Sequence, residues 1–395
     1  MYDVGMVLCG DRRTDLLGIA DVLLAHCCSF RAQCDVAVFS TCSQLARIAL
    51  HSTAHPTHLR LKNLHDVYYA LPQQAHILAH MRRCYARVTD VSISQPHWFP
   101  NSISQYMVAS GNRPRVHLVD IAILGREDGL GDDVRPIMPQ VVSVGAHLTM
   151  GGGRQVYYSG DIMLPTALES YTTNSVFTSI EWRQLLAHCP SLKSIGMGVD
   201  LHLLPDLVTT IGRFSEVHIS GTVGFRGREL AALGGALTNC RRLSQTLDKD
   251  TIKLLGVWHY APSVEHVELH FGGKHGLIGT VPLTYISDLL KTKLQVKSNV
   301  LTSFALVDFP VTTLVLRVLV HLFAAKGATL QTLAFRKCTI DDNVKWAECK
   351  AFTNLQRIEL RECADTSRRY ITHDPVRARS MFAGALPASA ALYIS

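Results

Sequence analysis

The chain has 395 residues, of which 47% are hydrophobic and 18% charged, and its formal net charge is +7. This composition excludes a disordered chain and allows a large apolar core. The basic residues are scattered rather than gathered in blocks, so the charge gives little support for a nucleic-acid-binding protein. The longest apolar stretch, Val311 to Ala325, is interrupted by Arg317 and His321, and we therefore expect no membrane span.

Two amphipathic helices are predicted near the amino terminus. Leu16 to Cys28 places apolar residues at helical spacing, and Cys34 to Leu50 repeats the pattern with a second apolar side. Both segments precede the first strand-like segment, which begins after Pro56. Residues 1–55 are therefore expected to form a helical cap that covers the open end of the following structure.

Strand-like segments recur from residue 56 to the end of the chain. The two best preserved follow the spacing L-x-x-L-x-L-x-x-C, at Leu330 to Cys338 and, 25 residues later, at Leu355 to Cys363. Apolar residues at i+3 and i+5 suit a short strand whose alternate side chains enter a core. The same template fits further segments, whose first core residues in the strand are Leu59, Val91, Val119, Ile195, Val217, Val267 and Phe304.

Two intervals fit the template less well. A degenerate repeat is expected near Asn239 to Leu255, preceded by a helix within Gly227 to Leu243. The interval 125–179 is rich in glycine and turn formers and contains one strand-like segment, Val141 to Gly145. It holds either two imperfect repeats, one of them with Val144 as its first core residue, or an insertion that leaves the repeat array.

The spacing and period of these segments resemble the leucine-rich repeat. The resemblance implies an α/β solenoid, shaped as a horseshoe or arc, with irregular repeats over residues 56–395 and the helical cap in front. The Cys of each motif is then expected at the turn that follows the strand.

The amino-terminal region, joined directly to the repeats, resembles the F-box of proteins that carry leucine-rich repeats. Thr41, Cys42, Ser43, Leu45 and Ala46 stand near the places of the family's Cys-containing segment. The chain departs from the family pattern because the usual Leu-Pro is replaced by Leu16-Leu17 and the usual aromatic residue by Leu45. The resemblance implies binding to a Skp-type adaptor, through the following residues: Leu16, Leu23, Leu24, Cys42 and Leu45.

A partner-binding face is predicted from the alternation of side chains along each strand. Residues between the core positions point to the concave side of such a solenoid. The candidates for protein binding are His58, Arg60, Lys62, Asp90, Glu216, His218, His266, Glu268, His270, Arg336, Arg357, Glu359 and Arg361. Their mixed charge favours a protein or peptide partner over the phosphate backbone of a nucleic acid.

Motifs for catalysis or metal binding do not fit the sequence. Gly272 to Lys274 lacks the Ser or Thr of a phosphate-binding loop, since His275 follows. The acidic segment Asp128 to Asp133 lacks the ligand alternation of a calcium loop, and the 19 histidines include no H-E-x-x-H. A structural place at the turn of the repeat explains Cys338 and Cys363 better than a catalytic role as nucleophiles does. We expect no enzymatic activity, no cofactor and no metal.

The predicted function is therefore a non-enzymatic scaffold that binds a protein on its concave face. The family resemblance implies the substrate-recognition subunit of a cullin-RING ubiquitin ligase of the F-box type. The alternative is a structural subunit of a large ribonucleoprotein or organellar assembly, which the charge of +7 and the apolar end of the chain motivate. A regulator that covers an enzyme or GTPase is not distinguished from the scaffold by sequence.

The location predicted from the cysteines is intracellular, in the cytoplasm or nucleus. There are 11 cysteines, an odd number without a C-x-x-C pair, and the amino terminus shows no secretory leader. This usage is typical of a reducing compartment.

Overall fold

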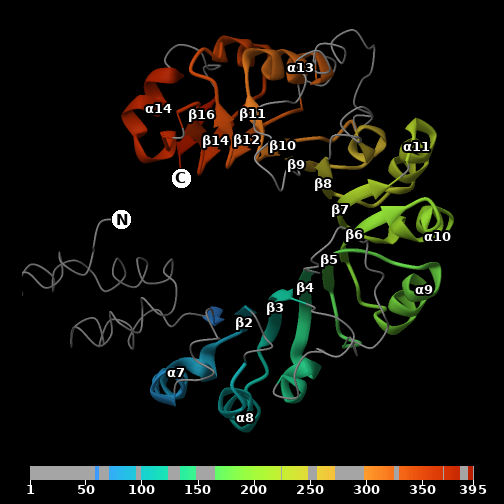
Figure 1. Ribbon diagram of the computed structural model, residues 1–395, viewed down its shortest axis with the longest axis vertical. Coiled ribbons are helices and arrows are strands. Elements are labelled where there is room, and N and C mark those ends of the chain that lie inside the picture. The colour runs from blue at the N-terminus through green and yellow to red at the C-terminus, as the bar shows by residue number, and fades with distance from the viewer. Residues whose placement is uncertain are drawn as a thin grey trace, which may run out of the picture. The chain divides into compact units, whose positions relative to one another are not determined.

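The chain folds as a mixed α/β structure with a long parallel sheet. The computed structural model (Figure 1) describes residues 58–61, 71–94, 99–122, 134–147, 165–223, 225–247, 256–271, 298–323, 329–367, 369–382 and 390–394. Its sheet has 13 strands in the order β1-β2-β3-β4-β5-β6-β7-β8-β9-β10-β12-β14-β16, which is also their order in the sequence. Parallel neighbours need a crossover between them, and α7, α9 and α13 are among the helices that the structure describes in such connections.

The described residues fall into two compact units. Unit 1 takes its residues from Met1–Arg154, Ser159–Tyr171 and Leu186–Ser191, and unit 2 takes the others, chiefly Thr172–Leu185 and Leu192–Ser395. The helices predicted between Leu16 and Leu50 lie outside the described residues. Among the described residues, no helix is both long and apolar enough to span a bilayer.

Unit 1 alternates short strands with helical turns. Its elements are β1 (His58–Leu61), α7 (Leu71–Cys84), η1 (Tyr85–Arg87), β2 (Asp90–Ser94), α8 (Asn101–Ala109), β3 (Arg115–Ala122), η3 (Arg135–Gln140), β4 (Val141–His147) and the start of β5 (Ser170–Val176). Met81 of α7 and Met107 of α8 are fully buried with the apolar side of the strands. The Asn112 amide donates to the backbone oxygens of Tyr85, at 2.6 Å, and Val88, at 2.8 Å, and so fixes the turn that leads into β3.

The core positions of β3 differ from the prediction. Val116 and Leu118 are fully buried, whereas Val119, expected in the core, is 38% exposed. Val116 lies opposite Val91 of β2, so the neighbouring strand decides which side chains are buried. The template was placed three residues too late because the strand continues with further apolar residues past its regular core.

Unit 2 begins with the end of β5 and repeats the strand-helix pattern. Its elements are α9 (Ser179–His188, whose last residues belong to unit 1), β6 (Ser194–Asp200), α10 (Leu204–Thr210), η4 (Ile211–Arg213), β7 (Glu216–Val223), α11 (Gly227–Ala236), β8 (Arg242–Leu247), η6 (Val257–Tyr260), β9 (His266–Phe271), β10 (Ser303–Val307), β11 (Pro310–Val311), α13 (Thr313–Phe323), β12 (Thr332–Arg336), β13 (Thr339–Ile340), η8 (Trp346–Ala351), β14 (Arg357–Arg361), β15 (Ala364–Asp365), η9 (Ile371–His373), α14 (Pro375–Met381) and β16 (Ala391–Ile394). The degenerate repeat expected near Asn239 contains β8, and the interval 125–179 contains β4 and β5.

The core of unit 2 lies between the strands and the helices that cover one side of them (Figure 1). The ring of Phe304 in β10 lies 5.5 Å from that of Trp258 and 5.0 Å from that of Phe323 in α13, measured between centroids. Phe352 extends this cluster at 6.3 Å from Phe323. Burial of each such side chain contributes about 1.5–3 kcal/mol to stability, before packing is considered.

The turns after β10, β12 and β14 share an unusual backbone conformation. Asp308, Lys337 and Glu362 have positive φ angles of 57°, 53° and 52°, in the left-handed region. Each residue directly follows its strand and redirects the chain into a short second strand. These short strands form a separate three-stranded sheet in the order β11-β13-β15.

The cysteines of the best preserved motifs connect neighbouring repeats. The Cys338 thiol donates to the Leu306 backbone oxygen at 3.3 Å, and the Cys363 thiol donates to that of Phe335 at 3.1 Å. Both residues are buried. Burial raises the pKa of the Cys338 thiol well above its ordinary value, so this thiol stays protonated and keeps its role as a donor.

Candidate functional site

The side of the unit 2 sheet that faces away from the core carries two rows of side chains that cross the strands, polar throughout in the first row and polar in part in the second. The first row consists of Ser194, Glu216, Arg242, His266, Ser303, Thr332 and Arg357, which are paired in register from β6 to β14. The second consists of Gly196, His218, Ser244, Glu268, Ala305, Ala334 and Glu359. We call these two rows, together with His270, Arg336 and Arg361 in the next register position, the polar face. It exists because parallel strands in register align alternate side chains across the sheet.

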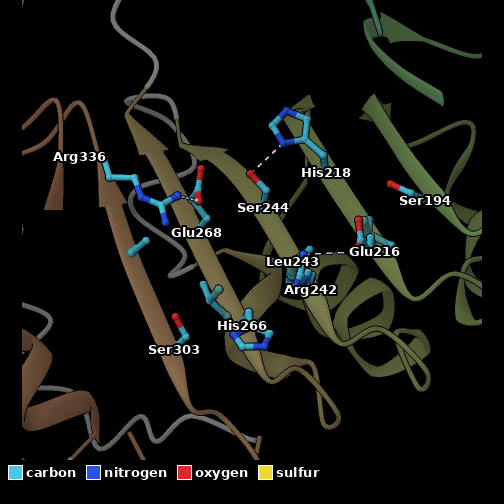
Figure 2. Close-up of a pocket in the computed structure, with 13 residues that line it drawn as sticks. Ser194, Glu216, His218, Arg242, Leu243, Ser244, His266, Glu268, Ser303 and Arg336 are labelled. Atoms are coloured by element: carbon cyan, nitrogen blue, oxygen red, sulfur yellow. Dashed lines mark hydrogen bonds and ion pairs between the residues drawn. The ribbon is translucent and has the colours of Figure 1, made fainter. Parts of the chain in front are cut away.

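Part of the polar face is hollowed. The hollow has a volume of about 430 Å³ and is lined by residues of β6, β7, β8, β9, β10 and β12. Figure 2 shows its floor, with Glu216 beside Arg242 and with Ser194 and Ser303 on opposite sides. The Arg242 guanidinium lies 3.6 Å from a Glu216 carboxylate oxygen. Polar groups of both charges therefore line a shallow site of a size that can take side chains of a bound chain.

Two histidines stand at one side of the hollow. His218 Nδ1 is 2.8 Å from the Ser244 hydroxyl on the adjacent strand (Figure 2). The rings of His218 and His270 meet edge to face, with centroids 5.9 Å apart. These contacts hold the two rings in defined positions, and ordered rings lose less entropy when a partner binds.

Glu268 is the central carboxylate of the polar face. One of its oxygens lies 2.8 Å from His270 Nε2, and the other lies 2.5 Å from a terminal nitrogen of Arg336. The hydrogen bond from His270 lowers the pKa of Glu268 from its ordinary value of 4.5, and the positive charge of Arg336 acts in the same direction against partial burial. The Glu268 side chain is therefore ionised at neutral pH.

Arg336 reaches across a whole strand. It belongs to β12, and Glu268 belongs to β9, while β10 lies between them in the sheet. The side chain has room for this path because the intervening residue of the second row is Ala305, which is buried. Figure 2 shows the guanidinium of Arg336 directed toward Glu268. A small residue on β10 thus permits an ion pair between strands that are not neighbours.

The network continues to the last strand of the sheet. Arg336 Nε is 3.8 Å from Glu359 on β14, and Arg357 approaches the other oxygen of Glu359 at 3.4 Å. The guanidinium of Arg357 also lies over the ring of Tyr393 on β16, 4.0 Å from its centroid. Ion pairs and a cation–π contact therefore fix two arginines on adjacent strands.

Unit 1 carries a smaller polar cluster on β1, β2 and β3. His58 Nε2 is 2.8 Å from the Ser92 hydroxyl, and His117 Nε2 is 3.2 Å from an Asp90 oxygen. The two imidazole rings are stacked, with centroids 6.2 Å apart. Burial, followed by the charge of Arg60, lowers the pKa of His58. Burial opposes ionisation of Asp90, but hydrogen bonds from His117 and Thr89 outweigh it and lower the pKa.

The residues predicted as a partner-binding face are distributed over both units. Unit 1 holds His58, Arg60 and Asp90, and Lys62 lies outside the described residues. The others belong to the polar face of unit 2, where the hollow unites the following: Glu216, His218, His266, Glu268 and Arg336. The proposed adaptor-binding residues Leu16, Leu23, Leu24, Cys42 and Leu45 lie outside the described residues.

Sequence reasoning missed several residues of the hollow. Arg242 and Ser244 were not predicted because β8 fits the repeat template poorly, although a repeat was expected there. Ser303 was not singled out because a single serine carries no signal in a sequence. Ala305 was missed because its role is steric, and only the strand order shows that Arg336 passes over it. Among the described residues, no group of three or more His, Cys, Asp or Glu side chains is placed to hold a metal ion.

No protein-family model matches the chain, and no curated protein sequence matches it significantly.

Proposed function

We propose that the chain is a leucine-rich-repeat solenoid that acts as a non-enzymatic scaffold, and that the polar face of unit 2 binds a partner protein. The observation that supports this function is the row of polar side chains from Ser194 to Arg357, one on each strand of the sheet from β6 to β14, with ion pairs that fix several groups of the polar face. The repeat assignment is supported by parallel strands in sequence order and by Cys338 and Cys363 at the turns.

The chemistry of the polar face suits a protein better than other partners. Acidic and basic groups form ion pairs across the strands, as in Glu216 with Arg242 and Glu268 with Arg336. Interfaces between proteins combine arginines and aromatic residues with a polar rim, and Arg357 with Tyr393 provides such a pair. The interspersed carboxylates would repel a phosphate backbone.

Affinity purification of the full chain tests this function. Ser303→Trp fills the hollow with a large side chain, and Gln184→Trp places the same side chain on the exposed surface of α9. We expect Ser303→Trp to lose at least one protein that both the wild type and Gln184→Trp recover, while thermal melting shows that both variants are folded. Equal recovery of every protein by the two variants would contradict a binding role for this face.

We further propose that the amino-terminal region is an F-box-like module and that the repeats select a substrate for a cullin-RING ubiquitin ligase. The support is the sequence resemblance around Cys42, joined directly to the repeats. The double substitution Leu24→Asp with Cys42→Asp should abolish copurification of a Skp-type adaptor but keep proteins that depend on Ser303. If a folded wild-type chain recovers no adaptor, the module is only a cap.

We place the protein in the cytoplasm or nucleus. Cys189, Cys240, Cys338, Cys349 and Cys363 are free and buried, and the thiols of Cys338 and Cys363 donate to backbone oxygens. Neighbouring thiols persist in a reducing compartment. Cell fractionation with a tagged chain checks this location, and recovery from the secretory pathway would contradict it.

A further inference from the structure

Three arginines gather on two adjacent strands of the polar face. Arg336 ends β12, and Arg357 and Arg361 begin and end β14. Arg336 lies directly opposite Arg361 in the register of these strands. Like charges in directly opposite positions destabilise a sheet. We call Arg336, Arg357 and Arg361 the arginine cluster.

Two of the three carboxylates near the arginine cluster, Glu268 and Glu359, lie deeper than the guanidinium groups of Arg357 and Arg361. Glu359 is 16% exposed and Glu268 is 32% exposed, whereas Arg357 is 44% and Arg361 57% exposed. Glu268 and Glu359 therefore hold arginines from below, and of the three most exposed charged groups two, Arg361 and Arg357, are positive and one, Glu362, is negative. This arrangement orients guanidinium groups before any partner binds, and preorganisation increases affinity.

The arginine cluster has donors that its own carboxylates do not use. Arg336 Nε is buried and has no hydrogen-bond partner, since the Glu359 oxygen at 3.8 Å is too distant. Arg361 has its nearest described carboxylate at 3.5 Å, on the adjacent Glu362 of the turn. Guanidinium groups have five N–H donors each and match carboxylates in pairs. The half-exposed side chains of Arg357 and Arg361 can offer their remaining donors to anionic oxygen atoms of a partner, whereas Arg336 Nε is buried.

We infer that the arginine cluster is the docking surface for an acidic segment of a partner protein, recognised through its Asp and Glu carboxylates. This inference deepens the proposed protein-binding function and rests on it. Charge complementarity selects the occupant, because two of the three most exposed charged groups here, Arg361 and Arg357, are cationic.

The spacing of the arginine cluster suits an extended peptide. Arg357 and Arg361 are four residues apart on one side of β14, which places their Cα atoms about 13 Å apart at the rise of a strand. An extended acidic segment along β14 would place carboxylates at i and i+4 with the same separation. A single-stranded nucleic acid is the competing polyanion, and the experiment distinguishes it from an acidic peptide.

Binding of a synthetic acidic peptide tests the inference on the full chain. The probe is a fluorescein-labelled peptide of six Ser-Glu repeats, and the matched control peptide has six Ser-Gln repeats. We expect fluorescence anisotropy at low salt to show binding of the first peptide only, with an affinity that falls as salt increases. A single-stranded thymidine oligonucleotide of 12 nucleotides is measured beside them. Binding of the oligonucleotide without binding of the acidic peptide would overturn the inference.

Substitutions with opposite expected effects locate the site. Arg357→Gln and Arg361→Gln should each weaken binding of the Ser-Glu peptide about tenfold, the loss expected for one charge-assisted hydrogen bond. Glu362→Gln should strengthen binding about twofold to threefold, because it removes a carboxylate that competes for Arg361. Arg317→Gln changes the net charge equally but lies on α13, and it should change the affinity less than twofold. Equal weakening by Arg317→Gln and Arg357→Gln would show a nonspecific charge effect and overturn the inference.

A purification separates this inference from the proposed function. The double variant Arg357→Gln with Arg361→Gln is compared with Ser303→Trp. We expect both to lose the same partner protein. Loss with Ser303→Trp but full recovery with the double variant would overturn the arginine cluster as a docking surface and keep the polar face as a binding surface. If Ser303→Trp also recovers every partner, the proposed function itself fails.

Discussion

The repeats around β10, β12 and β14 differ from those around β6, β7 and β8. The former have strands of five residues that pair without a register shift, and each strand is followed directly by a residue with positive φ. In the latter, β6 and β7 have seven and eight residues, and their pairing shifts between Met197 and Gly198. Regular repeats reuse one turn and one set of core positions. Where the strands lengthen, neighbouring side chains decide the details, as at Gly196, where an added Cβ would lie 2.5 Å from Thr172.

The largest effect should come from the core of the regular repeats. Phe304→Ala removes a ring that contacts Trp258 and Phe323, and we expect a loss of about 3–5 kcal/mol in the free energy of unfolding. Ser303→Ala alters the adjacent residue on the opposite side of the same strand and should change stability by less than about 0.5 kcal/mol. Urea denaturation measures both. Similar losses of unfolding free energy in the two variants would show that both sides of β10 are buried.

Two neighbouring glycines of α11 test how closely the elements pack in the less regular repeats. In Gly234→Ala the added Cβ would lie 2.6 Å from the Val257 backbone oxygen, and we expect a loss of about 1–3 kcal/mol. Gly235 has open space around its Cα, so Gly235→Ala should stabilise the protein by about 0.5–1 kcal/mol through helix propensity. Thermal unfolding shows whether each variant is less or more stable than the wild type. A change of stability in the same direction for both variants would contradict the packing of α11 against η6.

The ion pairs of Glu268 should give a smaller, pH-dependent contribution. The folded protein lowers the pKa of Glu268, so the carboxylate contributes stability above its ordinary pKa of 4.5 and loses that contribution as the pH falls toward the folded value. Glu268→Gln should be less stable than wild type by less than about 1 kcal/mol at pH 7, because solvent reaches the group. Urea unfolding should show that the difference in stability between Glu268→Gln and the wild type becomes smaller below pH 4.5. A constant difference would argue against the bridge from Arg336 to Glu268.

The smallest effect concerns the left-handed turns that distinguish the regular repeats. Lys337 has a φ of 53°, a conformation that costs a residue with a Cβ about 1 kcal/mol. Lys337→Gly relieves this cost but adds freedom to the unfolded chain, so the net gain should be under about 1 kcal/mol. The exposed residue Lys350, outside these turns, provides a control, since Lys350→Gly brings no such relief. Stabilisation by Lys350→Gly but not by Lys337→Gly would contradict the conformation of the turn.

The strands were predictable where a strand repeats the same apolar positions. Leu333 with Phe335, and Ile358 with Leu360, are buried as their spacing predicts. β5 was not predicted because its buried positions include Tyr171 and Thr173, which are not the aliphatic residues of the template. Val119 was assigned to the core because periodicity cannot choose between overlapping apolar registers, whereas pairing with β2 can.

The sequence by itself determined the class of the fold and the side of each regular strand that carries polar residues. Spacing of apolar residues is a local property, and burial of those residues is the main driving force of folding. Only the tertiary structure decided which polar residues meet. Arg336 finds Glu268, 68 residues away in the chain, because a small residue of β10 lies between their strands. The distance between such groups depends on register and on the volume of intervening side chains, and neither is encoded in the spacing of a single repeat.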